Sequence, residues 1–184
     1  NNNVYCQDNE IAWMDWSTLE EASDLHDFTR RLIELRRDHP VFRRRRFLAG
    51  GALGDEEHGR EIAWLTPECT LMTQDDWNTP FGRALMVFLD GDAIAEPDAR
   101  GQRVVDDSFL LMFNAHYEDI DFTVPGADFG DEWEVDVDTT QARGVLEDAA
   151  PVPSGGTVTV GQRSTVVLRR TQPPAGEGNV EANL

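Results

Sequence analysis

The sequence contains no lysine, and its basic residues are too few to balance its acids. All 16 basic residues are arginine, against 35 aspartates and glutamates, which gives a formal net charge of −19 at pH 7. Nucleic acids and anionic membranes attract positive charge, so neither is expected as a partner. This composition is better suited to neutral ligands such as glycans.

Cysteine is almost as scarce, since Cys6 and Cys69 are the only two in the chain. Neither belongs to a Cys-x-x-Cys or Cys/His pattern with metal-ligand spacing, so the sequence predicts no metal site and no cofactor. Two free thiols in a reducing cytoplasm are the preferred interpretation, and a disulfide between them stays open. The sequence also lacks a run of about 20 apolar residues, the length that a membrane-spanning helix needs.

One strong helical pattern follows an irregular segment at residues 1–22 and covers residues 23–39. Ser23 suits the N-cap position, and Pro40 ends the helix. The apolar positions recur at intervals of three and four and form a stripe on one side of the helix. These positions are Leu25, Phe28, Leu32 and Leu35. A lone helix cannot bury such a stripe, so in isolation we expect it to be exposed and to promote association.

Beyond Pro40 the apolar residues change to a period of two, which predicts β-strands. Glycine and proline turn signals separate the segments, as is typical of an antiparallel sandwich. Residues 92–105 form a predicted polar loop, and residues 171–184 a predicted disordered tail. The predicted strands are residues 61–65, 83–90, 108–115, 119–124, 132–138, 157–160 and 164–169.

The first sixteen residues are rich in amides and aromatics: Asn-Asn-Asn-Val-Tyr-Cys-Gln-Asp-Asn-Glu-Ile-Ala-Trp-Met-Asp-Trp. Amides and carboxylates pair with sugar hydroxyls, and aromatic rings cover the apolar faces of sugars. This segment resembles the loop after the eighth barrel strand in bacterial glycogen debranching enzymes, the isoamylase-like branch of the α-amylase superfamily. Residues 76–80, 83–91 and 106–116 resemble the C-terminal domain of those enzymes, and the similarity covers most of residues 1–170.

The resemblance implies a mainly β fold in two parts. Residues 1–40 would be the end of a (β/α)8 catalytic barrel, with a loop on the substrate face and the last barrel helix. Residues 41–170 would form a C-terminal antiparallel β-sandwich, followed by the tail at 171–184. The expected partners are therefore an α-glucan, such as glycogen or limit dextrin, and the missing barrel of the same protein.

The resemblance also implies an activity for the longer protein. The family hydrolyses α-1,6 branch linkages by a retaining mechanism that uses two carboxyl groups. In the family these groups precede the opening loop, so this chain is expected to hold no catalytic residue and to be inactive alone. The alternative is a free-standing α-glucan-binding module without catalysis, whose affinity would be lost on Trp77→Ala or Tyr5→Ala. The apolar helix at 23–39 disfavours it.

Candidate substrate-binding residues lie in the opening loop, where they would contact a branched glucan or brace the residues that do. For Asn3 and Tyr5 a purely structural role fits equally well. Trp13 and Trp16 are expected to pack the loop onto the barrel, because large aromatic residues usually serve burial. The candidates are Asn3, Tyr5, Gln7, Asp8 and Asn9.

Other residues of suggestive type receive structural interpretations. The adjacent acids Asp75-Asp76, Asp106-Asp107 and Glu118-Asp119 are expected in loops of so acidic a chain, and adjacency does not place two carboxyls across a sugar. Arg43–Arg46 should pair with acids rather than bind nucleic acid. Asn114-Ala115-His116 is predicted to form a turn stabilised by side-chain hydrogen bonds. Among the tryptophans, Trp64 and Trp133 are predicted to be buried and Trp77 exposed.

Overall fold

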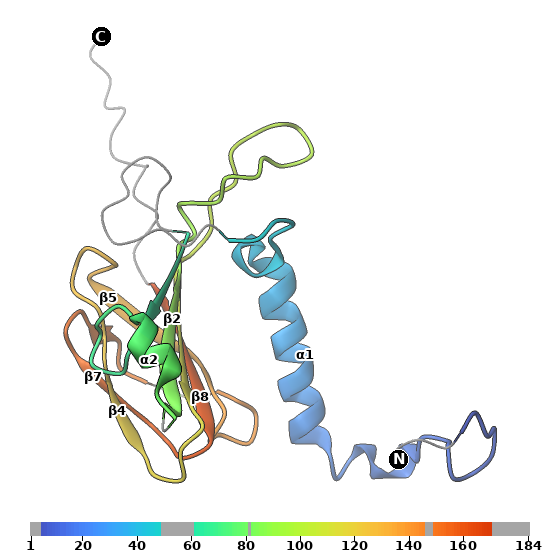
Figure 1. Cartoon of the computed structure of the whole chain (residues 1–184). Helices are drawn as coiled ribbons and strands as arrows, with labels where there is room; N and C mark the ends of the chain where they lie inside the picture. Colours follow the sequence, from blue (N-terminus) through green and yellow to red (C-terminus); the bar gives the residue numbers. More distant parts are fainter. Residues whose placement is uncertain (1–4, 49–60, 81, 146–148, 171–184) are drawn as a thin grey trace.

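The computed structural model describes residues 5–48, 61–80, 82–145 and 149–170 (Figure 1). Asn3 and the predicted tail at 171–184 therefore lie outside the described residues. The helical elements are η1 (Trp16–Leu19), α1 (Ser23–Asp38), η2 (Pro40–Arg43) and α2 (Gln74–Asn78). The strands are β1 (Ile62–Leu65), β2 (Ala84–Leu89), β3 (Phe109–Asn114), β4 (Ile120–Thr123), β5 (Glu132–Asp138), β6 (Val152–Pro153), β7 (Thr157–Val160) and β8 (Ser164–Arg170).

The strands form two antiparallel sheets, which confirms the predicted mainly β fold. The larger sheet has six strands in the order β1-β2-β3-β8-β5-β6, and the smaller pairs β4 with β7. β2, β3 and β8 lie inside the large sheet with six paired residues at each of their contacts. The apolar runs of β2 and β3 arise because central strands have neighbours on both faces.

One hydrophobic core fills the space between the two sheets. Trp133 is 0% exposed at its centre and lies edge-on to Phe88, with ring centroids 6.4 Å apart. The burial predicted for Trp133 is thus confirmed. Alternation along each strand sends every second side chain inward, so both sheets contribute. The other buried members are Ala63, Leu65, Met86, Leu110, Met112, Phe122, Val124, Val158, Val160, Val166 and Leu168.

The helix α1 runs beside the outer face of the large sheet (Figure 1). Phe28 and Leu35 pack against a second apolar cluster that includes Val87, Phe109 and Val167. Arg31 Nη2 also donates to the backbone carbonyl of Asp136 on β5 at 2.9 Å. Within the described ranges, the helix therefore contacts the sheet along one side of its apolar stripe.

The rest of the stripe is open, as predicted for an isolated chain. Leu25 is 65% exposed and Leu32 is 38% exposed. The prediction of Ser23 as N-cap is wrong, because the chain is already turning before it: the Ser23 N–H donates to the Glu20 carbonyl, and the helix begins at Ser23 after Ala22 without a side-chain cap.

The C-terminal end of α1 is joined to the sheet by an arginine–carboxylate network. Arg44 Nη2 lies 2.8 Å from Glu61 Oε1, and Arg44 Nε lies 2.8 Å from Glu96 Oε2. Arg46 also pairs with Glu61. The predicted pairing of this arginine run with acids is confirmed for Arg44 and Arg46. Arg44 is buried, with only 6% of its side chain exposed, so the run is not wholly solvated.

The turn after β3 is held by a buried amide, as its sequence predicts. Asn114 is 2% exposed, and its Nδ2 donates to the carbonyls of Glu118, Val160 and Gly161 at 2.9–3.0 Å. Its Oδ1 accepts the backbone N–H of His116 at 2.8 Å. One side chain therefore satisfies four backbone groups and links the two sheets, which explains its burial without a catalytic role.

Three further features differ from the predictions. Trp64 is 39% exposed, because it lies on the outer face of β1, the edge strand of the large sheet. The segment predicted as a loop around Trp77 contains the short helix α2, capped by Thr73 and Asp76. Strand β6 was missed because it is only two residues long and includes Pro153.

Candidate functional site

The opening loop, residues 5–16, is an exposed segment that extends from α1 away from the sheets (Figure 1). Two of its residues adopt a left-handed backbone, with φ of 48° at Tyr5 and 60° at Cys6. Such angles are uncommon outside glycine and mark a tight, defined turn. The loop therefore has a definite shape, although none of the described strands supports it.

Two candidate residues brace the loop from within. Asp8 Oδ1 accepts a hydrogen bond from the Trp13 indole Nε1 at 2.7 Å. Asn9 Oδ1 accepts the Ile11 backbone N–H at 3.1 Å, and the Asn9 carbonyl accepts those of Ala12 and Trp13. Asp8 and Asn9 thus fix the turn, the bracing role that the sequence left open for these candidates.

Tyr5 and Gln7 present their side chains to solvent. Tyr5 is 81% exposed, and within the described residues neither side chain makes a hydrogen bond. Both retain their donors and acceptors for a ligand. Asn3, the remaining candidate, lies in the part of the chain that is not described.

Large apolar side chains share this loop. The exposed fractions are 68% for Ile11, 60% for Trp13, 71% for Met14 and 73% for Trp16. A segment with so many exposed hydrophobic residues marks a contact surface. Nothing in the described chain covers Trp13 or Trp16, so their packing onto a barrel stays a prediction.

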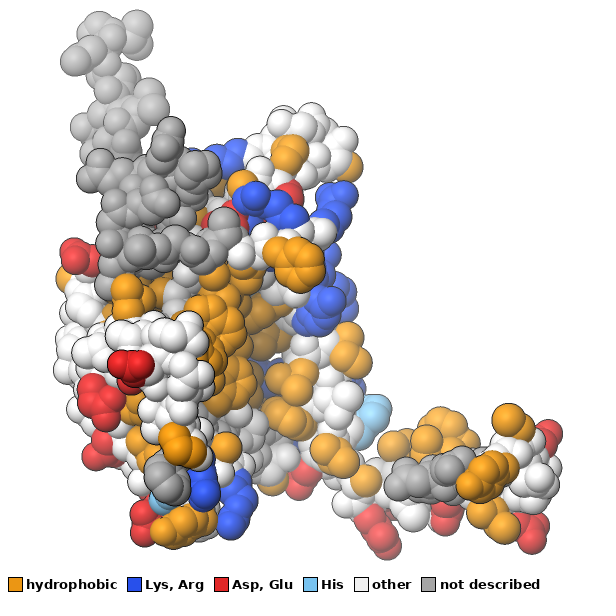
Figure 2. Space-filling model, viewed as in Figure 1, with side chains coloured by type: hydrophobic (Ala, Val, Ile, Leu, Met, Phe, Trp, Pro, Cys, Tyr) orange, Lys and Arg blue, Asp and Glu red, His pale blue; other side chains and the backbone are white. Residues whose placement is uncertain are grey.

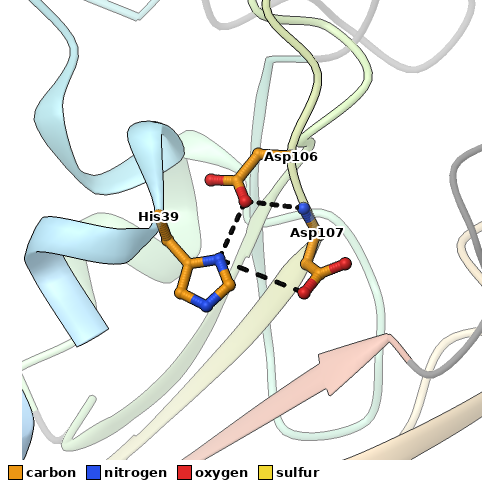
Figure 3. A group of neighbouring side chains, drawn as sticks. All are labelled: His39, Asp106 and Asp107. Carbon is orange, nitrogen blue, oxygen red and sulfur yellow. Dashed lines mark hydrogen bonds and ion pairs between the residues drawn. The ribbon is translucent and has the colours of Figure 1, made fainter. Parts of the chain in front are cut away.

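A cluster of His39, Asp106 and Asp107 has the composition of a metal site, and Figure 3 shows it at the junction of α1 and the sheet. Both carboxylate oxygens of Asp106 already make contacts within the chain. Asp106 Oδ1 lies 2.8 Å from His39 Nδ1 and accepts the Asp107 backbone N–H, while Oδ2 accepts the Val41 N–H at 2.8 Å. The cluster therefore joins the end of α1 to the segment just before β3. It does not form a pair of acids facing a cavity.

The other adjacent acids also have structural contacts. Asp76 accepts hydrogen bonds from the Thr73 backbone N–H and hydroxyl, which lower the pKa of its carboxyl and cap α2. Asp119 Oδ1 accepts the Gln162 backbone N–H at 2.9 Å. Asp76 and Asp119 therefore have structural contacts, and the absence of a catalytic residue from this chain stays a prediction.

The two cysteines are free thiols. Cys6 is exposed, whereas Cys69 is half-buried and its burial raises the pKa of the thiol. Among the helices that the structure describes, none has the length and apolar character to span a membrane.

A groove of about 600 Å³ lies where β1 ends, β2 begins and β3 ends. Trp77 on α2 forms one side and is 48% exposed, as the sequence predicts. Leu85 and Phe113, opposite each other on β2 and β3, also line the groove. Its polar lining comes from Thr66, Glu68, Asp76, Thr79, Arg83 and His116.

Comparison with known proteins identifies the sandwich. Residues 61–169 match the model of the isoamylase C-terminal family. The chain belongs to this family. The match begins at the strand that opens the large sheet and ends near the close of β8, so it covers the whole sandwich.

Relatives extend the similarity beyond the sandwich to α1. The chain is 48% identical over 171 residues to the glycogen operon protein GlgX homolog of Mycobacterium tuberculosis, which covers 93% of this chain and 23% of the relative. It is 31% identical over 125 residues to the glycogen debranching enzyme of Salmonella typhi, and this match covers 68% of this chain and 15% of the relative. The chain thus spans about a quarter or less of the length of these relatives.

Solved structures share the fold. Pullulanase from Bacillus acidopullulyticus superposes with a TM-score of 0.56 at 18% identity, over 92% of this chain and 16% of that one. Type I pullulanase of Bacillus subtilis, in complex with maltose, superposes with a TM-score of 0.51 at 20% identity, over 86% of this chain and 17% of that one. At such identities the likeness concerns the fold of this isoamylase-type C-terminal region.

Proposed function

We propose that this chain is the C-terminal part of an enzyme that hydrolyses α-1,6 branch linkages in glycogen or limit dextrins. The observation that carries the proposal is the 48% identity to the GlgX homolog over 93% of this chain, a share large enough to include α1 as well as the sandwich. A retaining glycosidase needs two carboxyl groups about 5–5.5 Å apart on either side of the scissile bond. We place these groups in the remaining part of the enzyme, together with the barrel that α1 would complete.

The opening loop would contribute to the substrate groove of that enzyme. Loops that follow barrel strands gather at the catalytic face, so a loop directly before the last barrel helix belongs there. In this arrangement Tyr5 offers a ring face and a hydroxyl, and Gln7 an amide, to the sugar. Asp8 would act indirectly, by holding the loop through Trp13. The reducing cytoplasm is the proposed location, in keeping with two free thiols.

Substitution of Tyr5 and Gln7 tests the role of the loop. In the full-length enzyme, Tyr5→Ala and Gln7→Ala should each raise KM for a branched oligosaccharide by roughly five- to ten-fold, since a lost neutral hydrogen bond weakens binding by about 1 kcal/mol. The kcat should change little, because these groups would bind ground state and transition state alike. Steady-state kinetics on a defined branched maltooligosaccharide measures both.

Glu21→Gln is a suitable control, because Glu21 is exposed and lies between the loop and α1. It should leave KM unchanged. If Tyr5→Ala and Gln7→Ala both behave like the control, the loop does not contact the substrate through these side chains.

A free-standing glucan-binding module fits the structure less well. Such a module would have little use for α1, whose Leu25 and Leu32 remain exposed, or for a loop that exposes Trp13 and Trp16. Exposed apolar surface of this extent belongs at an interface with further protein.

A further inference from the structure

The arginine run Arg43–Arg46 divides into paired and unpaired side chains. Arg44 and Arg46 pair with acids of the sandwich, whereas Arg43 and Arg45 are exposed. Within the described residues, the guanidinium groups of Arg43 and Arg45 make no ion pair and no hydrogen bond. Figure 2 shows arginine side chains gathered beside the C-terminal end of α1. In a chain with a net charge of −19, this is a local concentration of unpaired positive charge.

These arginines line a small pocket between η2 and the loop that follows β2. The pocket has a volume of about 280 Å³. Arg43, Arg44 and Arg45 contribute its positive charges, and Glu96 and Asp98 contribute its negative charges. Three arginines against two acids leave the lining with one excess positive charge.

Both acids of the pocket already accept hydrogen bonds from the chain. Glu96 accepts from Arg44 Nε at 2.8 Å and from the Arg45 backbone N–H at 3.3 Å. Asp98 Oδ1 accepts two backbone N–H groups of its own turn, both at 2.8 Å. The two exposed guanidinium groups therefore stay available for a further anion.

Arg44 adds a donor that is buried without a partner. Its side chain is only 6% exposed, and its Nη2 and Nε lie 2.8 Å from Glu61 and Glu96. Its Nη1, in contrast, makes no hydrogen bond with any described residue. A buried donor without an acceptor is destabilising, and such groups generally have a partner in the functional state. An anion in the pocket that this side chain lines would supply the missing acceptor.

We propose that this pocket binds the phosphate group of a small phosphate ester. A phosphate has three terminal oxygens that can accept from three arginines, whereas a carboxylate offers only two oxygens. The apolar part of the lining would face the organic part of the ester. This inference goes beyond the proposed function and does not depend on it. The apolar lining residues are Pro40, Ile94, Pro97, Ala99 and Val104.

The surroundings of the pocket favour a small ligand over a polyanion. A nucleic acid or an anionic membrane would extend past the pocket over a chain with 35 acids and 16 arginines, which would repel it. The pocket also lies at the opposite end of α1 from the loop that holds Tyr5 and Gln7 (Figure 1). The 16 residues of α1 span about 24 Å at 1.5 Å per residue. A phosphate ester in the pocket would therefore not compete with a glucan at that loop.

Isothermal titration calorimetry of the full-length enzyme with glucose 6-phosphate and with inorganic phosphate tests the proposal. The titrations are made at constant ionic strength and at about pH 8, where phosphate is largely a dianion. Arg43→Gln and Arg45→Gln are compared with Arg30→Gln, which removes the same charge from an exposed position on α1 outside the pocket. Both pocket arginines are exposed, so their replacement should leave the fold intact, which circular dichroism verifies.

At least one of the two compounds should bind. Arg43→Gln and Arg45→Gln should each weaken that binding at least about five-fold, because each removes a charge-assisted hydrogen bond. Arg30→Gln should change it by less than about two-fold, since solvent screens a distant exposed charge. Absence of binding by the unsubstituted enzyme would overturn the proposal. Equal effects of all three variants would also overturn it, since the anion would then not contact the pocket arginines.

Discussion

Replacing Trp133 with alanine is expected to lower the free energy of unfolding of residues 1–184 by about 3–5 kcal/mol, because it empties the largest site in the core. Trp133 is fully buried between the sheets and lies edge-on to Phe88, which in turn meets Phe129 with ring centroids 4.9 Å apart. Guanidinium unfolding followed by circular dichroism measures the loss. Trp133→Phe should cost clearly less, since it also removes an indole N–H that has no partner among the described residues.

Trp77→Ala is the matched control for this prediction. Trp77 is 48% exposed and lies outside the core, so its removal from residues 1–184 should cost about 1 kcal/mol or less. Equal losses for Trp133→Ala and Trp77→Ala would mean that the core is not organised around Trp133.

A second large loss is expected for Glu61→Ala. Glu61 is 1% exposed and pairs with Arg44, which is itself buried. Removing one partner of a buried ion pair leaves an uncompensated charge, so we expect a loss of about 3–5 kcal/mol. Arg44 would keep its contact with Glu96 at 2.8 Å, which favours the lower end of that range.

Glu134→Ala is the control, because it removes the same charge from an ion pair that is exposed. Glu134 pairs with Arg169 at 3.3 Å, but about half of the Glu134 side chain is exposed (52%). Solvent screens such a pair, and its loss should cost about 0–1 kcal/mol. The same small loss for Glu61→Ala and Glu134→Ala on unfolding in denaturant would mean that the buried ion pair does not stabilise the junction.

The positions of most strands could be predicted because period-two patterns follow from burial. It was harder to predict on which of the two faces of the sheet each side chain lies. Trp133, Val135 and Val137 alternate in sequence, yet Trp133 belongs to the core between the sheets and Val137 to the cluster under α1. A register shift against β8 between Val135 and Val137 turns the later residue to the opposite face. A single inserted residue leaves no mark on the alternation, so the sequence could not show it.

Trp64 illustrates a second limit. Its strand pattern predicts burial, but the burial of a residue on an outer face depends on what covers that face. In this chain α1 lies toward β5, and Trp64 is on the opposite edge of the sheet. The strand pattern gives the face on which a side chain lies, but not which neighbours cover that face.

The candidate site was predictable from composition in part. Amide and aromatic side chains indicated residues 5–9 as candidates, and the resemblance to isoamylase-type enzymes implied that they lie on the substrate face of a barrel. The sequence did not show which candidates brace the loop and which face solvent, because the contact between Asp8 and Trp13 depends on the turn that Asn9 closes. By contrast, the capping pattern Thr73-x-x-Asp76 could have indicated α2, since this spacing satisfies two backbone N–H groups at a helix start.

Hydrolysis of branched limit dextrin by the full-length enzyme and by residues 1–184, at equal concentration, shows whether the debranching chemistry lies outside this chain. Release of linear maltooligosaccharides from α-1,6 branches is followed by chromatography. We expect release by the full-length enzyme and none by residues 1–184, because the two carboxyl groups would lie outside this chain. Release by residues 1–184 alone, or no release by the full-length enzyme, would contradict this expectation.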